Sequence, residues 1–186
     1  MHYTRIDGGL KLDINDAVHE WLEQLGVTPK ARTPATPLPV HPEPKAGTPG
    51  ARPLGADELA WYLSAVGILQ YASKHLLGVA YAAAWHGSAR ARATKHHKDL
   101  ALRSLLFMLG SSRRGVTLVR SEFEHILETW TDTDWASCPW TRRSMSAVML
   151  RMFGMPLALW DTCADAGPKA AANNTPPADR RPFTAT

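Results

Sequence analysis

Apolar residues in the first part of the chain recur mainly at helical spacing. Positions three and four residues apart are apolar over four ranges: Asp13 to Leu25, Ala56 to Ala72, Leu76 to Trp85 and Thr94 to Leu109. On a helix this spacing puts the apolar side chains on one face. Four helices are therefore predicted, with Thr94 as an N-cap and Gly26 and Gly110 as C-terminal glycines.

Strand-like patterns lie on both sides of the helical region. Before the first helix, two short apolar runs flank Asp7-Gly8-Gly9, a sequence that favours the tight turn of a hairpin. After Gly110 the apolar period becomes strand-like in four runs: Gly115 to Arg120, Ile126 to Trp130, Met145 to Phe153 and Pro156 to Trp160. The predicted fold class is α+β, a helical bundle followed by an antiparallel meander of three to five strands.

Proline sets the predicted boundaries of these units. Eight prolines between Thr28 and Pro53 interrupt every helix or central strand, so this segment is predicted to be an extended or disordered linker. A proline-rich ligand for a partner domain is the alternative. Asp161 to Thr186 is rich in Ala, Pro and Asn and is predicted to be a disordered tail. Both segments are expected to be mobile.

Composition limits the classes of protein to which the chain can belong. Its 186 residues carry a formal charge of +4 with a pI near 9.3, which is compatible with a polyanionic partner. Two cysteines without C-x-x-C spacing indicate neither a disulfide framework nor a zinc site. No apolar run reaches the roughly 20 residues of a membrane helix. We expect an intracellular protein, cytoplasmic or nuclear, with no membrane partner.

Two carboxylates stand out in the strand region. Asp132 and Asp134 are two residues apart at the end of an apolar run, so on a strand they leave the same face. Such an arrangement can present acids to a metal ion. The alternative is that both are simply polar residues at a strand end.

The surrounding residues carry a more specific signal. The string TDTDWASCPWTRRSMSAVML, residues 131–150, resembles the S-D-A-D-W-A-G-x-x-x-x-R-[KR]-S-T-S-G-Y segment that opens the ribonuclease H domain in Pol polyproteins of copia-type retrotransposons. Gly154, Pro156 and Trp160 match the family's following G-x-P-[IV]-x-W. Upstream, WYLSAVGILQYAS is similar to the family's Y-R-S-L-V-G-S-L-x-Y-L-A, and Thr94 to Gly110 resembles its next helix. The resemblance covers about Ala17 to Trp160.

The resemblance implies a function and its limits. The intact family performs RNA-directed DNA synthesis and cleaves RNA/DNA hybrids with Mg²⁺, and Asp132 aligns with the first acid of the ribonuclease H cluster. The polymerase Y-[VL]-D-D motif would lie before Met1, and the segment after Trp160 does not match the helix that carries the next acids. We therefore expect an incomplete catalytic and metal site at Asp132, no stably bound cofactor and no activity of this chain alone.

With catalysis excluded, the activity that the resemblance still implies is weak nucleic-acid binding dominated by charge. The expected partner is an RNA/DNA hybrid or template, with the rest of the Pol polyprotein as a second partner. Eight cations are predicted to contact phosphate: Arg90, Arg92, Lys95, Lys98, Arg113, Arg114, Arg142 and Arg143. His96 and His97 add to the same basic surface. A solvated helix face is the alternative interpretation of these charges.

The resemblance also divides the chain into units. We expect a hairpin and short helix after the reverse-transcriptase palm (1–27), the linker (28–55), the helical C-terminal region of reverse transcriptase (56–114), the first part of ribonuclease H (115–160) and the tail (161–186). The hypothesis is thus a truncated, drifted Pol fragment. The alternative is a small helical interaction protein or non-functional relic without a nucleic-acid role.

Overall fold

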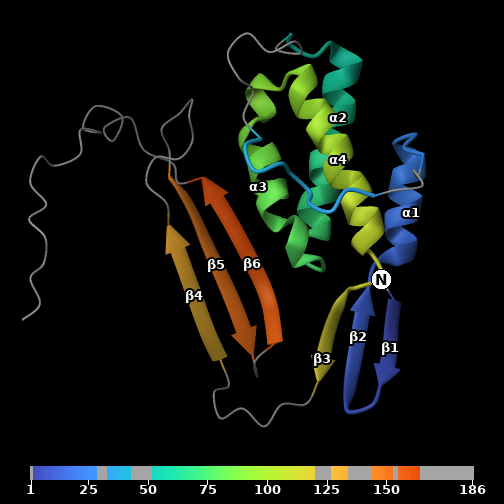
Figure 1. Cartoon of the computed structure of the whole chain (residues 1–186), viewed down its shortest axis with the longest axis vertical. Helices are drawn as coiled ribbons and strands as arrows, with labels where there is room; N and C mark the ends of the chain where they lie inside the picture. Colours follow the sequence, from blue (N-terminus) through green and yellow to red (C-terminus); the bar gives the residue numbers. More distant parts are fainter. Residues whose placement is uncertain are drawn as a thin grey trace, which may run out of the picture.

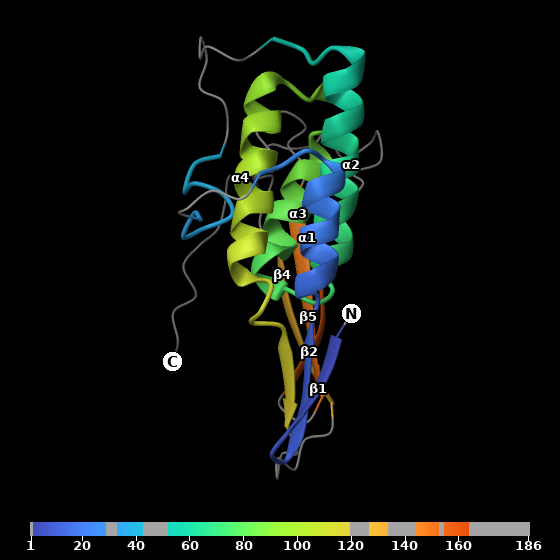
Figure 2. The same ribbon diagram turned by 90° about the vertical axis from the view of Figure 1, so that its right-hand side faces the viewer.

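The computed structural model describes residues 2–28, 33–42, 52–119, 127–133, 144–152 and 155–163, of which Met145 and 155–163 are described as backbone only. Over this part of the chain the fold is α+β, as predicted, with four α-helices and two three-stranded antiparallel sheets (Figure 1). The helices form a bundle at one end of the long axis. One sheet extends below the bundle, and the other lies beside α3 (Figures 1 and 2).

The first sheet begins with the predicted hairpin. Strands β1 (His2–Ile6) and β2 (Gly9–Asp13) pair antiparallel, and Gly8 between them has a φ of 68°, which glycine adopts without strain. Strand β3 (Val116–Val119) pairs with the other edge of β2. This pairing corrects one prediction, because Gly115 to Arg120 was expected to begin the C-terminal sheet.

A glycine explains why β3 joins the N-terminal sheet. Gly115 has a φ of 56°, and a Cβ atom at this position would overlap the carbonyl oxygen of Leu12. The chain leaving the helical bundle can therefore turn tightly and lie against β2. Periodicity alone identified β3 as a strand but gave no information about its partner.

The helices fall close to their predicted ranges. They are α1 (Asn15–Gln24), α2 (Ala56–Ala72), α3 (Ala80–Ser88) and α4 (Lys95–Ser111), with short 3₁₀ turns η1 (Leu77–Val79) before α3 and η2 (Arg90–Arg92) after it. Thr94 is the N-cap of α4, as predicted, and forms a capping box with His97.

The two glycines predicted to end helices behave differently. Gly26, with a φ of 66°, follows α1, where its N–H bonds to the Glu23 carbonyl and the next N–H bonds to the Leu22 carbonyl. Gly110 instead lies inside α4, which continues to Ser111, so its prediction as a C-terminal glycine was wrong. A Cβ at Gly110 would press on the side chain of Thr33, so this glycine serves close packing of the proline-rich segment.

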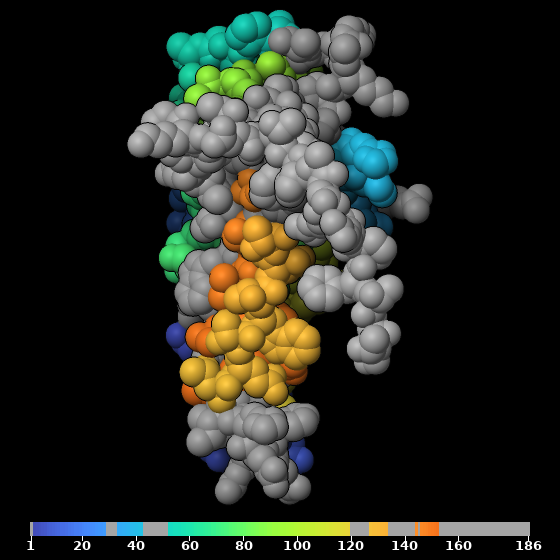
Figure 3. Space-filling model, turned by 90° about the vertical axis from the view of Figure 1, so that its left-hand side faces the viewer, coloured from blue at the N-terminus to red at the C-terminus, as the bar shows by residue number. Residues whose placement is uncertain are grey.

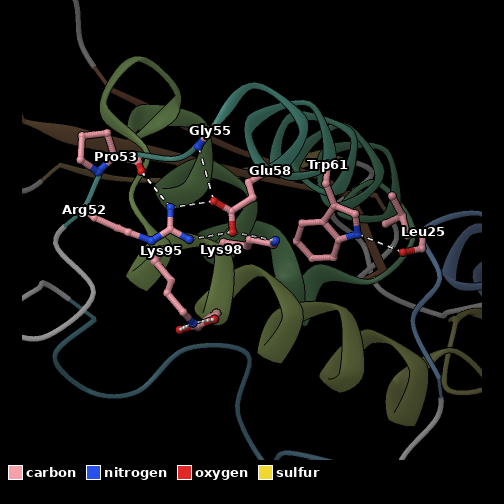
Figure 4. A network of polar contacts seen from close by, with 9 residues as sticks. Leu25, Arg52, Pro53, Gly55, Glu58, Trp61, Lys95 and Lys98 are labelled. Atoms are coloured by element: carbon pink, nitrogen blue, oxygen red, sulfur yellow. Dashed lines mark hydrogen bonds and ion pairs between the residues drawn. The ribbon is translucent and has the colours of Figure 1, made fainter.

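One hydrophobic core unites the four helices. Its fully buried members come from all of the long helices and include Val18, Leu22, Tyr62, Val66, Leu69, Leu105 and Met108. The indole N–H of Trp61 on α2 also donates to the Leu25 carbonyl oxygen at 3.0 Å (Figure 4). Helix α1 therefore packs in the same core as the helices between residues 56 and 114.

Part of the proline-rich segment is docked on the bundle. Residues 33–42 contain no helix or strand, in agreement with the pattern, but Leu38 is buried against Ala82 and Trp85 of α3. The Ser104 hydroxyl donates to the Pro37 carbonyl oxygen at 3.0 Å. The contacts of Leu38 and Pro37 therefore hold this stretch, which was predicted to be extended or disordered, against the bundle. Residues 29–32 and 43–51 of that linker lie outside the described residues.

The C-terminal sheet is the predicted meander. Strands β4 (Leu127–Thr133), β5 (Met145–Met152) and β6 (Met155–Cys163) are antiparallel in the order β4-β5-β6. β6 continues to Cys163, three residues into the segment predicted as a tail, and residues 164–186 lie outside the described residues. β6 lies next to α3 and β3, and β4 faces outward at the surface (Figure 3).

Candidate nucleic-acid interface

Asp132 lies near the end of β4 with its side chain exposed. Its partner across the ladder is Ala147 on β5, and the next pair is Thr133 with Ser146, whose hydroxyls are 3.2 Å apart. Asp134, predicted to share its face, lies outside the described residues. The structure therefore places one carboxylate of the predicted pair on an exposed strand.

The described residues do not fit the two-metal site that the resemblance implies. Within this part of the chain no three His, Cys, Asp or Glu side chains come together as metal ligands. Within β4, the other carboxylate on the face of Asp132 is Glu128, four strand positions away, which corresponds to about 13 Å. Glu128 also forms an ion pair with Arg151 at 3.4 Å. A single exposed carboxylate holds Mg²⁺ only weakly.

The predicted phosphate-binding cations fall into two groups at opposite ends of α4. Arg90 and Arg92 lie in η2, just before the helix, while Arg113 and Arg114 follow it. The 17 residues of α4 separate the groups by about 25 Å. Arg142 and Arg143 lie outside the described residues. The arginines on either side of the predicted basic surface are therefore separated by the length of α4.

The two lysines of the predicted set, which lie on α4, form ion pairs with carboxylates. The Nζ atom of Lys95 is 2.9 Å from Asp99, and that of Lys98 is 3.2 Å from Glu58, which also pairs with Arg52 at 2.9 Å (Figure 4). Hydrogen bonds from Arg52 and then Lys98 lower the pKa of Glu58 to about 2, so Glu58 is ionised at neutral pH. Both lysines are therefore less available to phosphate than the sequence suggested.

One histidine of the predicted basic surface, His97, also carries less charge than expected. His97 is buried, and its ring stacks on Trp85 with centroids 5.2 Å apart. Burial lowers the pKa of His97 to about 4, and the nearby charges of His96 and Arg92 act in the same direction. His96 lies 2.8 Å from the Pro42 carbonyl oxygen through Nε2. The assignment of His97 to a basic surface is therefore wrong.

Three cations keep exposed, unneutralised side chains. Arg90, Arg113 and Arg114 are exposed, and no carboxylate among the described residues forms an ion pair with any of them. Of the predicted set, these arginines are the best placed to meet phosphate. They lie in two separate places, with Arg90 before α4 and Arg113 and Arg114 after its end.

The structure contains a buried polar network that was not predicted from the sequence. The Tyr62 hydroxyl donates to the His86 carbonyl oxygen at 3.0 Å and lies 3.3 Å from its Nδ1, and His86 Nε2 is 3.2 Å from the Ser104 hydroxyl. Because that hydroxyl donates to Pro37, it accepts from His86. Burial lowers the pKa of His86 to about 3 and raises the pKa of Tyr62.

The network links α2, α3 and α4 to the proline-rich segment. His86 and Ser104 are fully buried, so solvent and substrate have no access to them. We interpret this network as a set of hydrogen bonds that joins the helices and stabilises the bundle. One signal was present in the sequence, since His86 lies three and four residues after Ala83 and Ala82 on the apolar stripe of its helix.

Comparison with known proteins assigns no family, since no family model, no curated protein and no solved structure matches the chain. Over the described residues, no helix combines the length and apolarity that crossing a membrane requires.

Proposed function

We propose that the chain is a drifted fragment of a copia-type Pol polyprotein, from the end of reverse transcriptase into the first strands of ribonuclease H. Its remaining activity is weak binding of an RNA/DNA hybrid or template. One observation carries the proposal. The described residues of the segment that resembles the family's ribonuclease H motif belong to a three-stranded antiparallel meander with Asp132 on the first strand. An order of helices followed by such strands is what the resemblance implies.

The binding that we propose depends on charge and not on base contacts. Arg113 and Arg114 supply two adjacent exposed guanidinium groups after α4, and Arg90 supplies a third at its other end. Guanidinium groups pair with phosphate oxygens in two-point contacts and release counterions from the nucleic acid. Affinity should therefore fall steeply with salt and vary little with sequence.

Anisotropy titration of a labelled RNA/DNA hybrid tests the proposal. At low and moderate salt, the chain should bind with a slope of log affinity against log salt of about −0.9 for each phosphate contacted. The double variant Arg113→Glu/Arg114→Glu should lower the affinity. It should also make this slope shallower by the amount that about two phosphate contacts contribute. Arg142→Glu/Arg143→Glu should act in the same direction.

The matched control is Arg5→Glu/Lys74→Glu, which makes the same change in net charge at two exposed positions outside the predicted set. If this control weakens binding as much as the Arg113/Arg114 variant, only net charge matters and the interface is wrong. Binding that neither salt nor any of these variants alters would overturn the proposal itself.

A helical interaction protein without a nucleic-acid role is the second candidate. The observation that favours it is the pairing of Lys95 and Lys98 with Asp99 and Glu58, which removes charge from the start of α4. An absence of hybrid binding at low salt, together with a folded bundle by circular dichroism, would support this candidate.

A further inference from the structure

We propose that the cavity where α4 passes into β3 is a binding site for a small carboxylate with an apolar body. The cavity has a volume of about 300 Å³ and lies at the lower end of the bundle in Figure 1, between η1, the end of α4 and β3. This site shares Arg114 with the proposed phosphate contacts, whereas no described side chain of the meander, Asp132 included, lines it.

The walls of the cavity are mainly apolar. Leu76 and Leu77 come from the turn before α3, Phe107 from α4 and Val116 from β3. Gly78 adds no side chain, and a Cβ at this position would lie 3.6 Å from the Phe107 ring, so the ring stays accessible from that side. Ligand sites typically combine such walls with a few polar groups that fix the orientation of the ligand.

The charge of the cavity favours an anion. Among the described residues, Arg114 is the one charged residue that lines it, none of the lining residues is acidic, and none forms an ion pair with its guanidinium group. Ser111 lies one helical turn before Arg114 and adds a hydroxyl group. A carboxylate at the mouth can thus pair with Arg114 while an apolar body contacts Phe107.

The helix dipoles do not reverse this preference. α4 ends at Ser111, which places partial negative charge near the cavity, but the helical segment of η1 and α3 begins at Leu77, which places partial positive charge there. Two dipole ends of about half a charge and opposite sign largely offset each other, leaving the full charge of Arg114.

The cavity volume sets the size of the ligand. At about 30 Å³ per water molecule in the liquid, 300 Å³ corresponds to about ten non-hydrogen atoms. A phenyl ring joined to a short chain with a terminal carboxylate is of this size. Ligands this small bind with dissociation constants of about a millimolar unless the site is very well matched.

Phenylpropionate is therefore a suitable probe, with phenylpropionamide as an uncharged match. Titration of the ¹⁵N-labelled full chain should shift the amide resonances of residues 76–78 and 114–117 in a saturable manner. Arg114→Gln, which keeps the first part of the side chain and a polar end but removes the charge, should weaken phenylpropionate binding about fivefold or more. Arg113→Gln is the matched control, because the neighbouring arginine does not line this cavity.

The outcomes separate this site from the proposed function. Saturable shifts confined to these residues, lost in Arg114→Gln and kept in Arg113→Gln, support the site whether or not the chain binds nucleic acid. The site is refuted if the probe causes no saturable shifts, if the amide binds as tightly as the carboxylate, or if Arg114→Gln binds like the unaltered chain. Circular dichroism of each variant establishes that loss of binding does not arise from loss of folding.

Discussion

Acid should destabilise the helical bundle because it buries two neutral histidines. Burial lowers the pKa of His86 from 6.5 to about 3 and that of His97 from 6.5 to about 4. The unfolded chain therefore takes up these protons at higher pH than the folded chain. The stability due to the two lowered pKa values is fully present above about pH 6.5 and is lost as the pH falls toward the folded-state values.

The size of the effect follows from these values. For each histidine, the free energy of unfolding falls by about 1.4 kcal/mol per pH unit below the unfolded-state pKa. At about pH 5 the loss is about 2 kcal/mol for His86 and a similar amount for His97, or about 4 kcal/mol together. Small domains are stable by only about 5–15 kcal/mol, so this loss is a large fraction of the total.

Urea denaturation followed by circular dichroism at about pH 7 and about pH 5 measures this loss. His86→Gln replaces the buried imidazole by a side chain that does not titrate, so the dependence on pH should become shallower by about 1.4 kcal/mol per pH unit. His19→Gln, at an exposed position on α1, is the control and should leave the dependence unchanged. If folded His86→Gln shows the same dependence as the unaltered chain, the argument is refuted.

Three further predictions concern the docked part of the proline-rich segment, the turn at Gly115 after α4, and catalysis. Leu38→Ala should lower the free energy of unfolding by about 2 kcal/mol because Leu38 is buried on α3, whereas Val40→Ala, at a side chain that is 91% exposed, should change it little in the same urea titration. Gly115→Ala should destabilise by about 2–3 kcal/mol because of its positive φ and the Leu12 carbonyl, while Gly67→Ala, with open space at its Cβ inside α2, should stabilise by up to about 1 kcal/mol. The chain with abundant Mg²⁺ should not cleave a labelled RNA/DNA hybrid, because Asp132 lacks described partner acids; cleavage that disappears in Asp132→Asn would contradict this expectation.

Local patterns predicted the elements well because each depends on neighbouring residues. The turn at Gly8, the cap at Thr94 and the helical periods all arise from interactions within a few positions. The three strands of the meander were predicted for the same reason, since each joins the next through a local reversal in the chain.

Contacts between residues far apart in the sequence explain the predictions that were wrong. Gly110 looks like a helix end in the sequence, but its role depends on Thr33, a residue on a distant segment. His97 looks like part of a basic run, yet Trp85 covers it. The candidate interface changed for the same reason, because the pairing of Lys98 with Glu58 joins two helices whose contact no local pattern specifies.

The pairing of β2 with β3 has a consequence for the synthesis of the chain. Gly9 lies opposite Val119, so the first sheet is completed only after most of the chain has left the ribosome. The β1–β2 hairpin must wait for that third strand, and an isolated two-stranded hairpin is at best marginally stable in water. Contacts between such distant residues also slow folding, because a long loop must close before they form. The edge of β2 that pairs with β3 therefore stays unpaired in the nascent chain while the helices are synthesised. A chaperone that binds extended segments could bind this edge during that time.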